Sequence, residues 1–307
     1  MVAKLVVICG ATATGKSDLA IEIAKEIGGE IVNADSMQVY KGMDIGTAKV
    51  PVSQREGIEH HLLDLVDVKT DVTVSWYQEI ARAKIDEINA RAKSAVVVGG
   101  TGLYIKAILD DLNFPDTDPE VRERITKEGE ALGNDGLHEK LAKLDPAAAL
   151  AIPKENVRRV IRALEVIEIT GKPFTANLPR ENSAKYPKAI QFGLVMDRES
   201  LNERIDLRVE KMWSQGFVSE VEELINVGML EGRTAQAAIG YAQIIRFKHG
   251  IFSEAEAKED TARATRQYAR RQETWFSKDA RIKWIKPGSV DERLNTILPD
   301  ILRVEDK

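Results

Sequence analysis

The stretch GATATGKS at Gly10–Ser17 constrains this chain more than any other part of the sequence. It fits the pattern G-x-x-x-x-G-K-[ST], follows an apolar run at residues 4–9 and opens a helical pattern, which is the context that a phosphate-binding loop requires. Glycines let the backbone wrap around an anion so that its N–H groups point inward. The sequence therefore predicts a polyphosphate site that consists of Gly10, Ala11, Thr12, Ala13, Thr14, Gly15, Lys16 and Ser17.

Two side chains of this loop have their own expected roles. The Lys16 ammonium adds a positive charge beside the phosphates, and the Ser17 hydroxyl is a ligand for Mg²⁺. The N-terminus of the following helix adds its partial positive charge. The pattern indicates a polyphosphate but leaves open whether that compound is ATP or another one.

Short β-branched runs alternate with amphipathic helical patterns, of which residues 16–28 and 76–93 are the clearest. Nearly continuous apolar strands that alternate with helices are typical of a parallel sheet covered on both faces. The predicted strands are residues 4–9, 30–34, 95–100, 190–196 and 281–285. We therefore expect an α/β fold, with a doubly wound parallel sheet as the core that carries the phosphate loop (P-loop).

The alternation of strands and helices stops between about residues 111 and 189. Here three helical patterns follow one another, at residues 118–130, 136–144 and 156–171. We predict a helical insertion domain at residues 113–188, within a catalytic core formed by residues 1–112 and 189–307. After residue 195 the chain is again mostly helical, with a long basic helix at residues 254–278 and one more strand.

The charge balance limits how this chain could bind nucleic acid. A net charge of −5 over 307 residues describes an ordinary globular surface, so RNA binding would need a local basic patch. The only cysteine, Cys9, lies in an apolar run, which predicts a buried strand residue and a reducing compartment. No segment approaches the roughly 20 apolar residues of a membrane span. We expect a cytoplasmic protein, monomeric and without a membrane partner.

The ends of two predicted strands carry further candidate site residues. A nucleotide hydrolase usually has a metal-binding Asp after a second apolar strand, but here the run AVVV leads into Gly99–Gly102, which contains Thr101. Another strand end supplies Asp35. Parallel strands end at one edge of the sheet, so we expect Asp35 and Thr101 beside the phosphate loop. On residue type alone, Asp35 fits a helix cap or a metal ligand at least as well as a catalytic group, and Thr101 fits a helix N-cap.

Six sequence words occur in a fixed order: DSMQVYKGMDIGTAKV (35–50), HHLLDLVD (60–67), VVGGTGLYIKAIL (97–109), RRVIRALEV (158–166), AAIGYAQII (237–245) and ARRQETWF (269–276). Together they resemble the tRNA dimethylallyltransferases, the isopentenyl (IPP) transferase family. Two departures occur in the phosphate loop, where Ala11 and Thr14 stand in place of the family's usual Pro and Ser, and neither position supplies a required side chain.

The resemblance implies that the phosphate loop holds dimethylallyl diphosphate, with Mg²⁺ as the metal. The allyl group would pass to the exocyclic amine of the adenine 3′ of the anticodon, in tRNAs that read codons beginning with U. By the same likeness Asp35 is the general base, and Thr101 hydrogen-bonds the bridging oxygen of the leaving group. Lys16 and Arg208 would stabilise the diphosphate; Arg204 and Arg208 share one helix face, although pairing with Glu203 and Asp206 is an equal alternative.

The resemblance also implies where tRNA is held. The segment that begins at the catalytic Asp touches the target adenine in the family, and the RRVIR stretch contacts tRNA. The expected tRNA-binding residues are Asp35, Ser36, Met37, Gln38, Thr101, Arg158, Arg159 and Arg162. Without the resemblance, pairing of the three arginines with Glu155 and Glu165 is favoured over contact with RNA. A second basic stripe, at Arg263, Arg266, Arg270 and Arg271, predicts salt-sensitive binding to the RNA backbone.

Two further groups of residues are expected to be structural. His60 and His61 are adjacent and have no third ligand near in sequence, so packing or hydrogen bonding is favoured over metal binding. Trp76, Tyr77, Met212 and Trp213 are expected to fill the core, although one or two of them could line an apolar slot for the allyl group.

Three other functions fit parts of the sequence. A P-loop kinase for a small molecule shares the loop, the fold and a helical lid. An isopentenyltransferase that acts on free adenine nucleotides shares the chemistry, but leaves the insertion and the basic helix unexplained. A non-catalytic RNA-binding protein leaves the loop and Asp35 unexplained.

Overall fold

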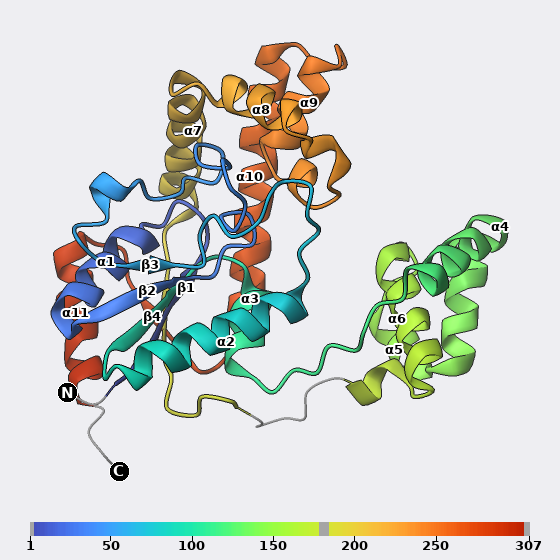
Figure 1. Ribbon diagram of the computed structural model, residues 1–307, viewed down its shortest axis with the longest axis horizontal. Helices are drawn as coiled ribbons and strands as arrows, with labels where there is room; N and C mark the ends of the chain where they lie inside the picture. Colours follow the sequence, from blue (N-terminus) through green and yellow to red (C-terminus); the bar gives the residue numbers. More distant parts are fainter. Residues whose placement is uncertain (1–2, 178–183, 304–307) are drawn as a thin grey trace. The chain divides into compact units, whose positions relative to one another are not determined.

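Six parallel strands form one sheet in the order β3-β2-β4-β1-β5-β6 (Figure 1). The central strand β1 pairs with β4 on one side and β5 on the other, with Val7 opposite Val97 and Gln191. The predicted doubly wound α/β class is therefore confirmed. The strands are β1 Leu5–Gly10, β2 Gly29–Asn33, β3 His60–His61, β4 Ser94–Val98, β5 Ile190–Leu194 and β6 Ile282–Ile285.

This computed structural model describes residues 3–177 and 184–303 and divides into two compact units. The larger unit, residues 1–109 and 186–307, contains the sheet, and the smaller unit is residues 110–185. These limits lie three residues before the predicted limits of the insertion, 113 and 188.

Alternate residues of β1 pack against two different helical layers. Val7 and Cys9 face the cluster formed with α2 (Val74–Ala90) and α3 (Gly102–Leu109). Val6 and Ile8 face the cluster formed with α1 (Lys16–Ile27) and α11 (Val290–Leu302). Every residue of β1 is buried, as expected for a strand covered on both faces. Burial raises the pKa of the Cys9 thiol to about 12, so the structural interpretation of this cysteine is confirmed.

A third apolar cluster joins the segment after β2 to the helices that follow β5. The cluster includes residues of α7 Arg198–Ser214, α8 Phe217–Asn226 and α9 Tyr241–Lys248, and α10 Glu254–Phe276 follows these helices along the chain. Tyr40, Phe217 and Tyr241 are fully buried in this cluster. Short 3₁₀ turns at Val52–Gln54, Met229–Glu231 and Ala235–Ala237 connect its parts.

The smaller unit has a core of its own. Its elements are α4 Pro119–Leu144, α5 Pro146–Ala151, α6 Val157–Thr170 and a 3₁₀ turn at Phe174–Asn177. Gly133, with φ of 69°, interrupts α4 between the two helices predicted for this stretch. Glu165 is fully buried, and its carboxylate accepts hydrogen bonds from Arg122, Arg162 and the Asp118 N–H group.

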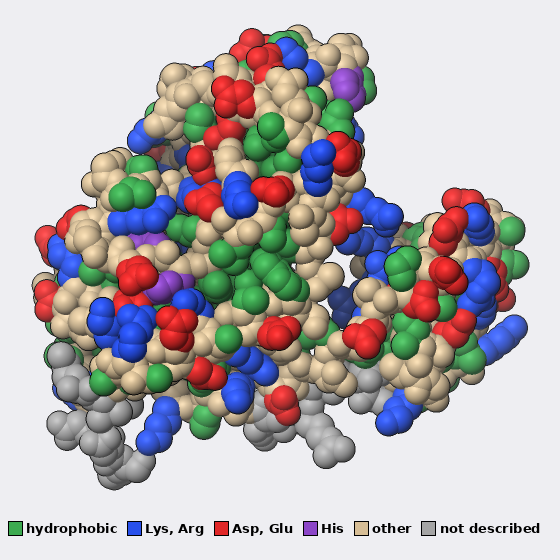
Figure 2. Space-filling model, viewed as in Figure 1, with side chains coloured by type: hydrophobic (Ala, Val, Ile, Leu, Met, Phe, Trp, Pro, Cys, Tyr) green, Lys and Arg blue, Asp and Glu red, His purple; other side chains and the backbone are tan. Residues whose placement is uncertain are grey.

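Strand β3, the short helix α5 and helix α11 are among the elements that were not predicted. Strand β3 has only two residues, which is too short for a periodic signal. Helix α11 has apolar residues at helical spacing, Val290, Leu294, Ile297 and Ile301, so its sequence did contain the signal. Acidic and basic side chains are interspersed on the surface seen in Figure 2. Within the described part of the chain, no helix has the length and apolar composition needed to cross a membrane.

Candidate functional site

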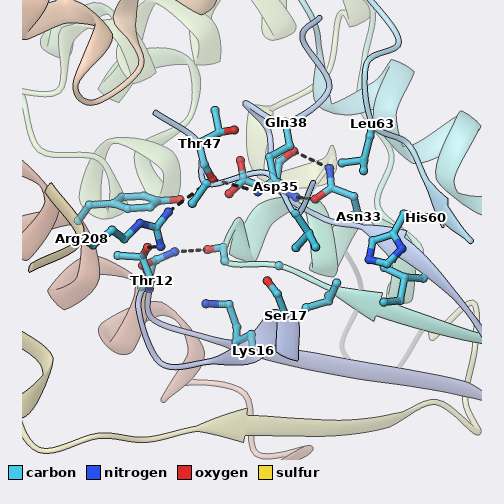
Figure 3. Close-up of a pocket in the computed structure, with 18 residues that line it drawn as sticks. Thr12, Lys16, Ser17, Asn33, Asp35, Gln38, Thr47, His60, Leu63 and Arg208 are labelled. Carbon is cyan, nitrogen blue, oxygen red and sulfur yellow. Dashed lines mark hydrogen bonds between the residues drawn. The ribbon is translucent and has the colours of Figure 1, made fainter. Parts of the chain in front are cut away.

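Two adjoining cavities open where β1, β2 and β4 end. The first, of about 90 Å³, is lined by polar residues of the phosphate loop and of the strand ends (Figure 3). The second, of about 290 Å³, is lined by apolar residues of α7 and of the segment before α9, and by Thr261, Thr265, Tyr268 and Arg271 of α10. Five residues line both cavities: Thr12, Asp35, Thr47, Arg208 and Tyr268.

The phosphate loop turns sharply between β1 and α1. Gly10 has φ of 133°, and a Cβ there would lie 2.8 Å from the Leu194 carbonyl oxygen, so only glycine fits. Gly15 precedes α1 in a left-handed conformation and provides no side-chain cap. The first N–H groups of α1 are therefore free of a side-chain acceptor and suit an anion. Lys16 and Ser17 follow and line the first cavity, which is where the loop pattern placed them.

Lys16 and Arg208 put two positive charges at the phosphate loop. Lys16 Nζ donates to the Ala11 carbonyl at 2.5 Å. Arg208, on α7, donates to Thr12 Oγ1 at 3.1 Å and to the Thr47 carbonyl at 3.4 Å. Burial and the nearby Arg208 lower the Lys16 pKa to about 8, and burial also lowers the Arg208 pKa. Arg204, which shares a helix face with Arg208, is exposed and lines a groove on the outer side of the loop.

Asp35 lies across the cavity from Lys16 and Ser17 (Figure 3). Its Oδ1 accepts the Met37 N–H at 2.8 Å, and its own N–H donates to Asn33 Oδ1 at 3.1 Å. The described residues give Oδ2 no hydrogen-bond donor, so this oxygen can accept a proton. The carboxylate thus caps a turn and also faces the cavity.

Thr101 lies beside Asp35, as the strand-end argument predicted. Its Oγ1 accepts the Ser36 N–H at 3.2 Å. The Thr101 carbonyl, not the hydroxyl, accepts the first N–H groups of α3, from Tyr104 and Ile105. The N-cap alternative for the Thr101 side chain is therefore not what the structure has.

Gln272, on α10, is a buried site residue that the sequence reasoning missed. Its Oε1 accepts the Thr12 N–H at 2.9 Å, and its Nε2 donates to the Gly100 carbonyl at 2.8 Å. A Cβ on Gly100 would lie 2.1 Å from Gln272 Nε2, and a Cβ on Gly99 would lie 2.2 Å from the Ala34 carbonyl oxygen. The two glycines thus allow close packing where a hydrolase would place a metal carboxylate. Gln272 lies in the recognised word ARRQETWF, but only the fold brings it to the loop.

Arg293, on α11, was also missed. It is 5% exposed, and its Nη1 donates to the Thr14 carbonyl at 2.7 Å behind the phosphate loop. Its buried Nε has no hydrogen-bond partner within the described chain. Arg293 therefore adds a third cation near the loop, from a helix that carries no recognised motif.

The second cavity has an apolar wall. Met212, Val209, Ala238 and Ile239 line it. Of the four residues expected in the core, Met212 is the one that lines this cavity, while Tyr77 is fully buried and stacks on Tyr104 with ring centroids 3.8 Å apart. Trp76 and Trp213 are partly buried against the cores.

The two adjacent histidines have different surroundings. His61 Nε2 lies 2.7 Å from Glu30 Oε2, and His60 Nδ1 lies 2.9 Å from the Ile58 carbonyl while its ring lines the first cavity. Glu30, Glu59 and His61 bring three ligand atoms together. Arg91 and Lys93 already donate to the Glu30 carboxylate and lower its pKa to about 2. His60 and His61 therefore take part in hydrogen bonding, as predicted.

The predicted RNA-binding arginines fall into two groups. Arg158 and Arg159 are exposed on α6. Arg162 donates to Glu165 and to the carbonyls of Pro115 and Asp116, which is the pairing alternative raised for it. On α10, Arg263 pairs with Asp260 and Arg266 with Asp206, while Arg271 lines the second cavity.

Comparison with known proteins places this site in context. The family model "IPP transferase" matches residues 38–279. The tRNA dimethylallyltransferase of Nocardioides sp. is 51% identical over 296 residues, covering 95% of each chain, and that of Thermobifida fusca is 51% identical, covering 94% of this chain and 91% of the relative.

Solved structures show the same likeness. The tRNA isopentenylpyrophosphate transferase of Bacillus halodurans is 37% identical, with a TM-score of 0.72 and coverage of 97% of this chain and 95% of that one. A eukaryotic dimethylallyltransferase captured acting on tRNA is 27% identical, with a TM-score of 0.82 and coverage of 98% and 78%. Both likenesses extend over nearly all of this chain.

Proposed function

The chain belongs to the IPP transferase family, and from this premise we propose that it transfers a dimethylallyl group from dimethylallyl diphosphate to the adenine 3′ of the anticodon in tRNAs that read codons beginning with U. The observation that carries the proposal is the position of Asp35. It lines both the polar cavity at the phosphate loop and the adjoining apolar cavity. A base at this junction can meet an amine that attacks the carbon next to a bound diphosphate.

In the proposed reaction, the adenine amine forms a bond to the allyl carbon while the bond from that carbon to the diphosphate oxygen breaks. The amine proton passes to Asp35, and the electron pair of the broken bond leaves with the diphosphate. Lys16, Arg208 and the loop N–H groups stabilise the charge that develops on the leaving group. From the likeness to the family we propose that the Thr101 hydroxyl, which donates to Ser36 Oγ at 3.4 Å in the structure, turns to donate to the bridging oxygen of the bound diphosphate.

Mg²⁺ fits the oxygen groups at this site. The Ser17 hydroxyl lines the cavity beside Lys16, with the Asp35 carboxylate on the opposite side. Mg²⁺ in proteins commonly uses one or two such oxygens together with substrate phosphates. When bound on Ser17, it would neutralise charge on the diphosphate.

The acceptor must enter the site as a single flipped base, since an adenine stacked in an anticodon loop cannot reach a carboxylate that lines a cavity. Ser36, Met37 and Gln38 line the cavities next to Asp35 and suit contact with this base. Arg158 and Arg159 are the exposed cations of the insertion that suit the tRNA backbone. We also propose that the protein is a monomer in the cytoplasm.

One assay tests the proposal against its alternatives. The protein is incubated with Mg²⁺, labelled dimethylallyl diphosphate and unmodified tRNA, with AMP or ATP as acceptor in parallel reactions. Label on tRNA alone is the expected result. Label on free nucleotide would assign the protein to the nucleotide-acting branch, and phosphate transfer from labelled ATP without prenyl transfer would support the kinase. Binding of tRNA with neither reaction would leave a non-catalytic RNA-binding protein.

Binding of inorganic diphosphate should weaken at alkaline pH. The charged form of Lys16 is the form that binds the anion, and its pKa in the free protein is about 8, so above this pH binding must also take up a proton. By linkage, the association constant should fall about tenfold between pH 7 and pH 9. Titration calorimetry at constant Mg²⁺ measures it. Lys16→Arg should bind without this decline because arginine stays charged; an equal decline in this variant would assign it to another group.

Replacing Arg158 and Arg159 together by alanine should raise the KM for tRNA and leave the KM for dimethylallyl diphosphate unchanged. The slope of log KM for tRNA plotted against the logarithm of the salt concentration should decrease by roughly 0.7 for each phosphate contact that is removed. Arg124→Ala, an exposed partner of Glu168 in the same unit, is the matched control. A KM for tRNA equal to that of the control would show that Arg158 and Arg159 do not bind tRNA.

A further inference from the structure

The segment between β2 and the 3₁₀ turn at Val52–Gln54 carries groups of the site but has almost no regular structure. It includes Gln38 and Thr47, which line the first cavity. Backbone without helix or sheet bonds must be held by side chains if it is to keep one geometry. The turn's own bonds, such as that from the Ala48 N–H to the Ile45 carbonyl at 3.0 Å, hold part of the stretch around Thr47, and a side chain from a distant helix binds the backbone donors just before Thr47.

That side chain is Glu220, in the first turn of α8. Its Oε2 accepts the N–H groups of Asp44 at 3.1 Å and Ile45 at 2.7 Å. Its Oε1 accepts the N–H of Gly46 at 3.2 Å and the hydroxyl of Tyr241 at 2.6 Å. Three consecutive backbone donors around one carboxylate form an anion nest, which an ionised carboxylate suits best.

Packing fixes the same turn from the other side. A Cβ on Gly46 would lie 2.3 Å from the Phe217 ring and 2.5 Å from the Tyr241 ring, so the backbone there lies directly against these aromatics. Phe217 and Tyr241 meet edge to face, with centroids 4.9 Å apart, and both are buried. The nest and the rings together leave the turn little freedom.

The residue that follows the nest connects it to the site. The Thr47 carbonyl accepts a hydrogen bond from Gln38 Nε2 at 3.0 Å and from Arg208 Nη2 at 3.4 Å. Arg208 in turn donates to Thr12 in the phosphate loop. The residues just before Thr47 are bonded to Glu220, and this fixes the Thr47 carbonyl. That carbonyl in turn orients Gln38 beside the base Asp35 and Arg208 beside the diphosphate site.

We propose that Glu220 is a positioning residue for prenyl transfer, which acts through the turn at residues 44–47 to place Arg208 and Gln38. The inference rests on the proposed function of the site. It predicts that Glu220 governs the use of both substrates, although it lines neither cavity and touches neither substrate.

The test is Glu220→Gln, which keeps the size of the side chain but replaces one acceptor oxygen by an NH₂ group, which donates hydrogen bonds and cannot accept them. We expect kcat to fall about 100-fold, the loss that a misplacement of about 1 Å produces. The KM values for dimethylallyl diphosphate and for tRNA should both rise about tenfold, because each rotamer-rich contact group loses its fixed position. Glu222→Gln, on the same helix and paired with Lys248 at the surface, is the matched control.

Rates are normalised to the folded fraction, measured by circular dichroism. A structural role alone would lower the melting temperature and the active fraction while both KM values stayed unchanged, and that result would overturn the proposal. A double-mutant cycle adds a second criterion. Arg208→Lys should lower kcat by a much smaller factor in the Glu220→Gln background than in the wild type, and additive losses of kcat would also overturn the proposal. If the wild type and Glu222→Gln fail to prenylate tRNA, the proposed function itself fails.

Discussion

Asp35→Asn should bind both substrates and lose turnover. Removal of a positioned general base costs about 10² to 10⁴ in rate, and this variant removes the basic oxygen while its remaining carbonyl can still accept the Met37 N–H. Single-turnover prenylation of tRNA measures the loss, and filter binding and calorimetry measure the two affinities. Turnover is expected to fall at every pH because the asparagine amide does not accept a proton near neutral pH.

Two comparisons separate the base from the turn that contains it. Asp67→Asn, an exposed carboxylate paired with Lys41, should react like the wild type. Asp35→Glu keeps a carboxylate but moves it by one methylene, so it should retain more activity than Asp35→Asn. An Asp35→Asn variant with turnover near wild type and weakened tRNA binding would reassign Asp35 from proton transfer to base recognition.

Lys16→Met should lose about 10² to 10³ in kcat/KM for dimethylallyl diphosphate, the usual consequence of removing one preorganised charge from a leaving-group site. The ammonium reaches the Ala11 carbonyl across the loop, and methionine has a similar length without charge or donor. Steady-state kinetics with saturating tRNA measures the effect. The KM for tRNA should stay unchanged, since Lys16 lies on the diphosphate side of the cavity.

Lys25→Met provides the comparison for this variant. Lys25 is on the same helix and pairs with Glu22 and Glu56 at the surface, so its loss should leave the kinetics unchanged. Equal activity of Lys16→Met and Lys25→Met would mean that Arg208 and the backbone suffice to hold the diphosphate.

Residues that depend on local pattern could be predicted from the sequence. Lys16 and Ser17 follow from the loop and its flanking strand and helix. The rule that parallel strands end at one edge predicted that Asp35 and Thr101 lie beside the loop. Their catalytic roles, and the choice of Arg208 over Arg204 on the same helix face, came from the resemblance to the family.

Residues whose role depends on packing between distant elements could not be found in this way. Gln272 meets the phosphate loop across 260 residues of sequence and Arg293 across 279, while Glu220 meets its nest across about 175. A glutamate or arginine on an amphipathic helix usually faces solvent, so residue type gives no signal. The way in which α8, α10 and α11 pack decides which of their polar side chains face inward.

The contact between α11 and the start of the chain has a consequence for biosynthesis. Lys4 donates to the carbonyls of Ile301 and Leu302, and Arg293 supports the loop at Thr14, so the two ends of the described chain complete one structure. A ribosome that adds about 5–20 residues per second takes about 15–60 s to go from Thr14 to Arg293. During that interval the nascent phosphate loop lacks its rear support, so it cannot reach its final form until α11 has been made, after the strands on either side of it.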